Sequence, residues 1–300
     1  MTNRIARVGL TAKRGLTAAA SVLADLAAWL QARGVTPVFD TETARLAGVT
    51  GTTVSREDLP LQCDLIVVLG GDGTLIGMAD RIAASGADVP ILGVNYGSLG
   101  FLTEITLPEL HGELESALAG RAQFTARAML IARTVRDGGV FAEHMVLNDI
   151  VITKAALSRM IEIAVTVDEA PVTTVRADGL IIASPTGSTA YNLAAGGPIV
   201  HPAVDAILLT PIAPHTLTNR PIVIPASSTV RVQSVMDEQD EVFVTFDGQA
   251  GFPLRPSDRV EIRRAARPIR VVHSAKRTYF ELLREKLKWG GGAPSPLREI

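Results

Sequence analysis

The segment "DLIVVLGGDGTLIGMAD", residues 64–80, joins an apolar run to a glycine-rich loop and then to a helical pattern. An apolar run without alternating polar residues is typical of a strand that is covered on both faces, as in a parallel sheet. The pattern predicts a helix from about Leu75, so the loop at 69–74 follows the carboxyl end of a strand. Because open α/β sheets bind ligands outside the carboxyl ends of their strands, this loop is the first candidate site.

The first 120 residues repeat this alternation of strand and helix. Short apolar segments and helical patterns occur in turn at residues 4–10, 17–32, 36–40, 64–70, 90–95 and 107–119. Gly120 follows the last of these helices in the position that a helix C-terminus favours. We therefore predict an α/β domain over residues 1–120, with a Rossmann-like parallel sheet.

Period-two strands separated by turn residues dominate from residue 121. Examples are "LIARTVRDGGVFAEHMVL" (130–147) and "MIEIAVTVDEAPVTTV" (160–175), with turns predicted at "RDGG" and "VDEAP". These patterns predict antiparallel hairpins and an all-β, β-sandwich-like domain over residues 121–272. The C-terminal segment, 273–300, contains a predicted helix at 277–289 and a tail that we expect to be mobile.

The composition is that of a globular protein of two domains. Of 300 residues, 47% are hydrophobic and 20% are charged, and the formal net charge is −2. This balance argues against a broad nucleic-acid or anionic-membrane surface, and no apolar run reaches the roughly 18 residues of a membrane span. Asp25 interrupts the leader-like stretch 16–30, which we interpret as an internal helix. The single cysteine, Cys63, is predicted to be a buried hydrophobe and fits a reducing cytoplasm.

Asp72 stands between glycines in a loop that suits phosphates. Glycine-rich turns let backbone N–H groups approach phosphate oxygens, and the following helix adds its positive N-terminal end. The loop is neither a Walker A motif nor a GxGxxG fingerprint, so it lacks a cation of its own. A carboxylate there points to phosphoryl transfer, in which Mg²⁺ neutralises the donor phosphates while Asp72 orients or deprotonates an accepting hydroxyl. The alternative is that Asp-Gly only forms a tight turn.

A second segment rich in glycine and hydroxyl groups, "RADGLIIASPTGSTAYNLAAGGPIVHP", occupies residues 176–202. It repeats the order of strand, small-residue turn and short helix. Its hydroxyl groups, the small Gly187 and the ring of Tyr191 suit a nucleotide. Read as structure only, the same segment is a strand, a turn and a capped helix.

These motifs resemble the NAD kinases, within the wider group of kinases that carry GGDGT. The resemblance covers nearly the whole chain, through "GGDGT" (70–74), "GVNYGSLGFLTE" (93–104), "LNDIVI" (147–152), the segment 176–202, "PHTLTNRPIVI" (214–224) and "DGQ" (247–249). GGDGT alone is shared with phosphofructokinases and lipid kinases, whereas the long segment is highly specific. The resemblance implies transfer of a phosphoryl group to the 2′-hydroxyl of the adenosine ribose of NAD, giving NADP.

The resemblance also implies roles for particular residues. Asp72 becomes the base, in a loop for the donor phosphates that consists of Gly70, Gly71, Gly73 and Thr74. The residues implied to contact NAD are Asp72, Gly73, Asn148, Asp149, Arg159, Arg176, Asp178, Thr189, Ala190, Tyr191, Asn192, Leu193, Ala194 and Gln249. No residue is assigned to a metal, although we expect a divalent metal, Mg²⁺. Gly77 stands where many relatives carry a basic residue, which removes one expected phosphate contact.

The predicted site is acidic for one that holds anions. Its carboxylates predict ribose hydroxyls and a metal as partners, with two arginines that balance the charge; these residues are Asp72, Asp149, Asp178, Asp247, Arg159 and Arg176. Each of them is alternatively a member of a surface ion pair.

By the same resemblance the enzyme is a homo-oligomer, a dimer or a tetramer, and its last helix packs back on the first domain. We expect a nucleotide site between the domains, with Asp72 in reach of the ribose oxygen and opposite the stretch that begins at Arg176. We expect no nucleic-acid or membrane partner. Competing hypotheses are a lipid or sugar kinase with the same loop and a dinucleotide-binding sensor without turnover. The sequence leaves the donor open among ATP, other nucleoside triphosphates and polyphosphate, and leaves NADH undecided as an acceptor.

Overall fold

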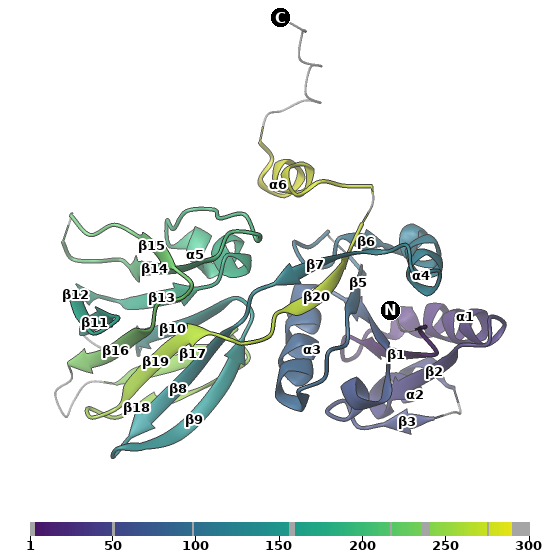
Figure 1. The fold of residues 1–300 in the computed structure, drawn as a ribbon, viewed down its shortest axis with the longest axis horizontal. Coiled ribbons are helices and arrows are strands. Elements are labelled where there is room, and N and C mark those ends of the chain that lie inside the picture. Colours follow the sequence, from purple (N-terminus) through teal and green to yellow (C-terminus); the bar gives the residue numbers. More distant parts are fainter. Residues whose placement is uncertain are drawn as a thin grey trace, which may run out of the picture. The chain divides into compact units, whose positions relative to one another are not determined.

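A computed structural model of the chain describes residues 4–49, 52–97, 99–155, 160–216, 218–235, 241–274 and 276–289. It divides into two compact units, whose elements are labelled in Figure 1. The first unit comprises the described residues of Met1–Arg81, Ala87–Thr125 and Arg270–Ile300, and the second comprises those of Ile82–Gly86 and Ala126–Ile269. The first unit is therefore discontinuous in sequence.

The first unit is built on one sheet with the order β3-β2-β1-β4-β5-β20-β7, in which β6 also pairs with β5. Its strands are β1 (Arg7–Ala12), β2 (Thr36–Asp40), β3 (Thr53–Val54), β4 (Leu65–Gly70), β5 (Ile91–Asn95), β6 (Ile105–Thr106), β7 (Gln123–Arg127) and β20 (Ile269–His273). The described pairings among β1 to β6, and that of β20 with β5, are parallel. β4 and β5 are buried at every position, as expected of central strands covered on both faces.

Helices cover both faces of this sheet. The helices of the first unit are η1 (Thr17–Ala19), α1 (Ala20–Gln31), α2 (Thr41–Ala47), η2 (Leu59–Gln62), α3 (Asp72–Ser85), η3 (Leu107–Glu109), α4 (Leu110–Leu118) and α6 (Tyr279–Leu287), of which α6 stands apart from the sheet in Figure 1. α1, α2 and α4 share one apolar core with residues of β1, β4 and β5, and α3 lies on the other side of the sheet (Figure 1). Asp40 caps α2 by accepting from the backbone N–H groups of Glu42 and Thr43.

α3 begins at Asp72 rather than at about Leu75, so the predicted start was wrong by one turn. The N–H groups of Thr74 and Leu75 both donate to the carbonyl of Gly71. The glycine-rich residues therefore already form the first helical turn, although the apolar periodicity begins only at Leu75. Asp72 belongs to that turn.

The order of the strands reverses between β1 and β4. From β1 the chain continues to β2 and β3 on one side, and from β4 it continues to β5 on the other. The segments that follow β1 and β4 therefore diverge. Ligands of doubly wound sheets bind in the crevice at such a topological switch point.

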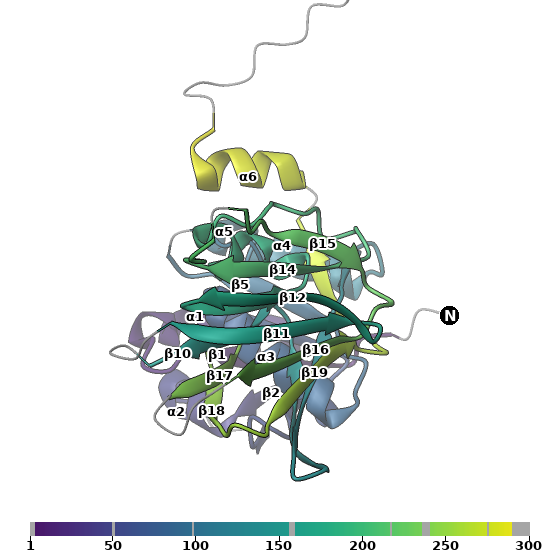
Figure 2. The same ribbon diagram turned by 90° about the vertical axis from the view of Figure 1, so that its left-hand side faces the viewer.

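The second unit is a sandwich of two six-stranded antiparallel sheets. Their orders are β15-β14-β13-β10-β17-β18 and β12-β11-β16-β19-β8-β9, and Figure 2 shows β12, β11, β16 and β19 side by side. The elements are β8 (Leu130–Arg136), β9 (Gly139–Val146), β10 (Asp149–Lys154), β11 (Ile161–Val167), β12 (Ala170–Ala177), β13 (Gly179–Ala183), η4 (Thr186–Thr189), α5 (Tyr191–Ala194), β14 (Ala206–Ile212), β15 (Ile222–Pro225), β16 (Val230–Val235), β17 (Val242–Phe246), β18 (Ala250–Leu254) and β19 (Arg259–Arg264). Buried residues of β10, β13 and β17 share one core with those of β11, β16 and β19, so the inner faces of the two sheets pack together.

The predicted fold class is confirmed in both units. Asp137 and Gly138 form the turn between β8 and β9, and Asp168 and Glu169 form that between β11 and β12, all with positive φ. Cys63 is buried and forms no disulfide, and burial raises the pKa of its thiol to about 12. Within the described ranges, the helices lack the combination of length and apolar character needed to cross a bilayer. The predicted tail at 290–300 lies outside the described residues.

Candidate active site

The loop at residues 70–74 contains two kinds of glycine. A Cβ added at Gly70 would lie 2.6 Å from Thr74 Oγ1 and 3.2 Å from Lys13 Cβ, so the packing of the fold itself requires glycine there. A Cβ added at Gly71 or Gly73 would meet nothing within 4 Å, and neither residue has a left-handed φ. The fold does not demand glycine at these two positions, and the open space beside them is available to a ligand.

Asp72 is held in one orientation by the segment 101–103. Its Oδ1 accepts from Leu102 N (3.1 Å), Thr103 N (3.0 Å) and Thr103 Oγ1 (2.9 Å), and its Oδ2 accepts from Phe101 N (2.8 Å). A carboxylate oxygen has two lone pairs. Oδ2, with one described donor, therefore retains the capacity to accept a hydrogen bond or a proton from a hydroxyl group.

Gly100 makes this arrangement possible. A Cβ at position 100 would lie 2.0 Å from Asp72 Oδ1 and 2.3 Å from Thr103 Oγ1. No other residue fits without displacing the carboxylate. The stretch 93–104 carries part of the family resemblance, but the sequence does not indicate the roles of Gly100 and Thr103, because no sequence pattern marks backbone N–H groups that converge on a distant aspartate.

The segment 147–149 of the second unit is fixed by Asp247. Its Oδ2 accepts from Leu147 N (2.8 Å), and its Oδ1 accepts from Asn148 N (2.7 Å) and Asp149 N (3.0 Å). Asp247 itself lies in the turn between β17 and β18 with φ 51°. These three backbone donors are partners of Asp247 that the sequence did not indicate.

The turn after β13 packs directly on this segment. Ser184 N donates to the carbonyl of Asn148 (2.9 Å), and Ser184 Oγ donates to the carbonyl of Leu147. A Cβ at Gly187 would lie 2.1 Å from Asn148 O. The structure therefore brings together two of the predicted motifs, "LNDIVI" and the segment 176–202.

Asp149 is a buried carboxylate, with 6% of its surface exposed. Burial in the first place, and the neighbouring Asp247 carboxylate in the second, raise the pKa of Asp149 from 3.8 to about 7. Near neutral pH this side chain is therefore able to donate as well as accept a proton.

Arg176 and Asp178 lie at the opposite end of β13 from Ser184. In the pairing of β10 with β13, Asp149 is opposite Ala183 and Thr153 is opposite Gly179, and the Asp178 carbonyl accepts from Lys154 N (3.1 Å). Six residue steps separate Asp178 from Ser184 along this strand, which is about 20 Å. Arg176 is exposed, and Asp178 Oδ1 lies 3.7 Å from Lys154 Nζ.

The segment 189–194 combines a buried asparagine with an exposed tyrosine. Asn192 donates to the carbonyls of Ser188 (3.0 Å) and Pro198 (3.1 Å) and accepts from Thr210 Oγ1 (2.6 Å), so its side chain holds the turn against β14. Tyr191 is 47% exposed. Its ring is accessible to a ligand, and its stacking on a nucleotide stays a prediction.

The remaining predicted contacts occupy the surface of the turns or fall outside the described residues. Thr189, Ala190 and Leu193 are partly buried, whereas Ala194 and Gln249 are exposed. Gln249 follows Asp247 in the β17–β18 turn, where its N–H donates to the carbonyl of Phe246 (2.9 Å). Arg159 lies outside the described residues.

Family models match most of the chain. The ATP-NAD kinase N-terminal domain matches residues 8–122, and the ATP-NAD kinase C-terminal domain matches residues 147–274. An NAD kinase of Geobacter sulfurreducens is 52% identical over 270 residues, which is 90% of this chain and 93% of that protein. An NAD kinase of Syntrophotalea carbinolica is 47% identical over 284 residues, covering 95% and 99% of the two chains.

Solved structures share the fold. The crystal structure of yeast NADH kinase complexed with NADH has a TM-score of 0.87 at 25% identity, over 99% of this chain and 91% of that one. An NAD kinase from Archaeoglobus fulgidus in complex with ATP has a TM-score of 0.74 at 24% identity, over 94% and 98% of the chains, and this likeness concerns the fold alone.

These matches and the fold define a phosphotransferase with an alcohol group as acceptor. The chain belongs to the NAD kinase family. The resemblance that the sequence motifs indicate is thereby confirmed.

Proposed function

We propose that this chain transfers a phosphoryl group from ATP or polyphosphate to the 2′-hydroxyl of the adenosine ribose of NAD, giving NADP. The observation that supports this most directly is the oriented carboxylate of Asp72 in the first turn of α3, next to two glycines that the fold does not require. Family membership supplies the acceptor and the reaction.

Asp72 acts on the acceptor hydroxyl. Oδ2 accepts the hydrogen bond of the hydroxyl and aligns its oxygen for attack on the terminal phosphorus of the donor. As the new O–P bond forms, the bond from that phosphorus to the bridging oxygen breaks, the shortened donor leaves with that oxygen, and Oδ2 takes up the hydroxyl proton. Because phosphoryl transfer passes through a loose transition state, alignment and charge neutralisation contribute more than proton removal. The four donors that hold Asp72 prevent the carboxylate from rotating away during this step.

The donor phosphates occupy the open side of the loop formed by Gly70, Gly71, Gly73 and Thr74. Among the described residues, no group of three or more metal-binding side chains occurs. Mg²⁺ is usually held by one or two carboxylates together with substrate phosphates. This fits Mg²⁺ that arrives bound to the donor phosphates, where it would neutralise their charge.

NAD is held by the second unit around the segment that Asp247 fixes. We assign to it the exposed ring of Tyr191 for stacking and the side chains of Asn148 and Asp149 for the ribose hydroxyls. The full proposed set is Asp72, Gly73, Asn148, Asp149, Arg159, Arg176, Asp178, Thr189, Ala190, Tyr191, Asn192, Leu193, Ala194 and Gln249.

A homo-oligomer in the cytoplasm is part of this proposal. Asp178 lies about 20 Å along β13 from the end that packs on Asn148. A second copy is able to present its Arg176 end to the Asn148 end of the first. Light scattering of the purified chain measures the oligomeric state, and cell fractionation measures the location.

The decisive experiment measures NADP formation. Purified protein is incubated with NAD, Mg²⁺ and either ATP or polyphosphate, and NADP is detected with an NADP-specific dehydrogenase; NADH is offered in parallel. Asp72→Asn is expected to lower kcat by about 10²- to 10⁴-fold with NAD binding retained, whereas Asp25→Asn on the exposed face of α1 leaves kcat unchanged. The absence of NADP with every donor would refute the proposal, and binding of NAD without turnover would favour a sensor.

A further inference from the structure

A pocket of about 420 Å³ opens beside the end of β1, entirely within the first unit. One wall is the end of β1 and the segment after it, and the other is α2; the lining residues are Ala12, Lys13, Arg14, Gly15, Thr17, Glu42, Thr43, Arg45 and Leu46. It lies on the β1 side of the switch point, and the GGDGT loop follows β4 on the other side. Neither the motifs nor the proposed NAD contacts use these residues.

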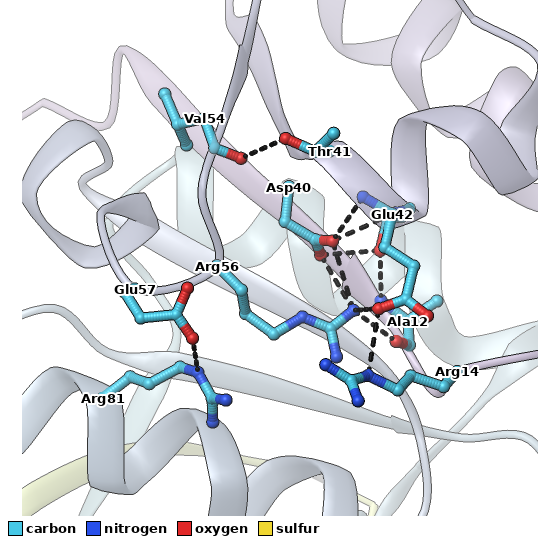
Figure 3. A network of polar contacts seen from close by, with 10 residues as sticks. Ala12, Arg14, Asp40, Thr41, Glu42, Val54, Arg56, Glu57 and Arg81 are labelled. Atoms are coloured by element: carbon cyan, nitrogen blue, oxygen red, sulfur yellow. Dashed lines mark hydrogen bonds and ion pairs between the residues drawn. The ribbon is translucent and has the colours of Figure 1, made fainter.

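The backbone at the end of β1 is held by hydrogen bonds to both the N–H and the carbonyl group of Ala12 (Figure 3). Ala12 N donates to Thr43 Oγ1 (2.9 Å), and the Ala12 carbonyl accepts from Arg56 Nη2 (3.0 Å). Asp40 ties these two partners together, because it accepts from Thr43 Oγ1 (2.6 Å) and from Arg56 (3.2 Å) and is only 1% exposed. The residues that follow Ala12 therefore leave β1 in a defined direction.

The pocket carries an excess of positive charge. Lys13, Arg14 and Arg45 line it, against a single carboxylate, Glu42. Arg14 is paired with Glu42 (3.0 Å), which Arg56 also approaches (3.8 Å). In the described part of the chain, Lys13 and Arg45 form no ion pair. Two cations in this pocket are thus available to an anion.

Lys13 also packs beside the GGDGT loop, although the two are far apart in sequence. Its N–H donates to the Leu69 carbonyl (2.8 Å), and its Cβ would be 3.2 Å from a Cβ at Gly70. The loop itself carries no basic residue, and Gly77 leaves the following turn of α3 without one. The neighbouring strand therefore provides the positive charge that the phosphate loop lacks.

We propose that this pocket binds the polyphosphate chain of the phosphoryl donor, with Lys13 as its principal cation and Glu42 as the residue that limits its affinity. The ligand class is a linear chain of three or more phosphates, either free or carried by a nucleoside. The proposal rests on the proposed function for the identity of this ligand as the donor, but binding to the pocket is measurable without turnover. Lys13 contacts the phosphates directly, and Arg14 becomes available to them when Glu42 releases it.

The first test is calorimetric binding of tripolyphosphate and of ATP to the full chain without NAD. Lys13→Met removes the charge and keeps the length of the side chain, and it is expected to weaken both ligands by about 10- to 100-fold. Lys276→Met, at an exposed lysine after β20 and outside the pocket, is the matched control and leaves both affinities unchanged. Weaker binding of ATP but not of tripolyphosphate would place the nucleoside in the pocket and overturn the proposal, as would equal losses in the control.

The second test removes a negative charge from the pocket, so the expected change in affinity is a gain and not a loss. Glu42→Gln removes the pocket's negative charge and frees Arg14, so tripolyphosphate is expected to bind at least about threefold more tightly. A gain in affinity cannot result from misfolding, and unchanged or weaker binding would contradict the proposal. In the turnover assay, Lys13→Met raises KM for the donor and leaves KM for NAD unchanged. If the wild-type chain makes no NADP but these binding effects occur, the proposed function fails and the anion pocket stands.

Discussion

Neutralising Asp149 is expected to stabilise the protein at alkaline pH. Its carboxyl group is 6% exposed, and its own N–H donates to Asp247 Oδ1 (3.0 Å), which brings a second carboxylate close to it. Burial, and secondarily Asp247, raise the pKa of Asp149 from 3.8 to about 7 in the folded chain. The Asp149→Asn variant keeps the shape of the side chain and removes the charge.

The sign and the size of the effect follow from the two pKa values. Below pH 3.8 the carboxyl group is protonated in both the folded and the unfolded chain, so it does not lower the free energy of unfolding. As pH rises from 3.8 the carboxyl group ionises more readily in the unfolded chain, so the free energy of unfolding falls until the folded group also ionises at about pH 7. At about 1.4 kcal/mol per pH unit, the full cost above pH 7 is about 4 kcal/mol. Asp149→Asn is therefore expected to be more stable than wild type by about 2 to 4 kcal/mol at pH 8, with a difference near zero at pH 4.

Scanning calorimetry from pH 4 to pH 8 measures this difference as a change in Tm. Asp205→Asn is the matched control, because Asp205 is 62% exposed and its ion pair with Arg264 lies at the surface; its Tm difference is expected to stay small at every pH. A gain for Asp149→Asn that is equal at pH 4 and pH 8 would show that the charge of the buried carboxylate is not its cause. A loss of Tm at pH 8 would refute the reasoning.

Three further substitutions test the residues that hold the candidate site in its conformation. Asp247→Asn leaves one of three backbone donors facing an amide NH₂ group, and it is expected to raise KM for NAD about tenfold with KM for ATP unchanged, as measured by steady-state kinetics. Gly187→Ala places a Cβ 2.1 Å from Asn148 O and is expected to lower the free energy of unfolding by about 1 to 3 kcal/mol in denaturant titrations. Gly100→Ala places a Cβ 2.0 Å from Asp72 Oδ1 and is expected to reduce kcat more than tenfold, since the carboxylate must move.

Gly112 provides the control for both glycine substitutions. It lies within α4, and an added Cβ there meets nothing within 4 Å. Gly112→Ala is expected to stabilise the chain by about 0.5 to 1 kcal/mol and to leave kcat unchanged. A similar loss of activity in Gly112→Ala and Gly100→Ala would mean that the contact with Asp72 is not the cause.

Apolar patterning predicted the fold well because burial leaves a regular trace in the sequence. β4 appears as an uninterrupted apolar run and is buried throughout, whereas β11 alternates between buried and more exposed positions. The predicted start of α3 was wrong because the glycine and aspartate residues before Leu75 add nothing to the periodic pattern of apolar residues, although their backbone forms the first turn of the helix. Helix boundaries set by glycine loops are therefore less visible than helix interiors.

The sequence indicated the carboxylates of the site but not what holds them. Asp72 stood out by its motif, while its partners at 101–103 are backbone N–H groups, which every residue except proline possesses. The same holds for Asp247, whose partners lie 98 to 100 residues earlier. Contacts of this kind depend on tertiary structure, so no local pattern announces them.

The discontinuity of the first unit has a consequence for the order of folding during synthesis. β5 is complete at residue 95, but its partner β20 begins only at residue 269. A nascent chain thus carries the edge of β5 without β20 until the whole second unit has left the ribosome. Unpaired strand edges invite pairing with other chains, so a stalled or truncated product that stops before residue 269 is the species most prone to aggregate.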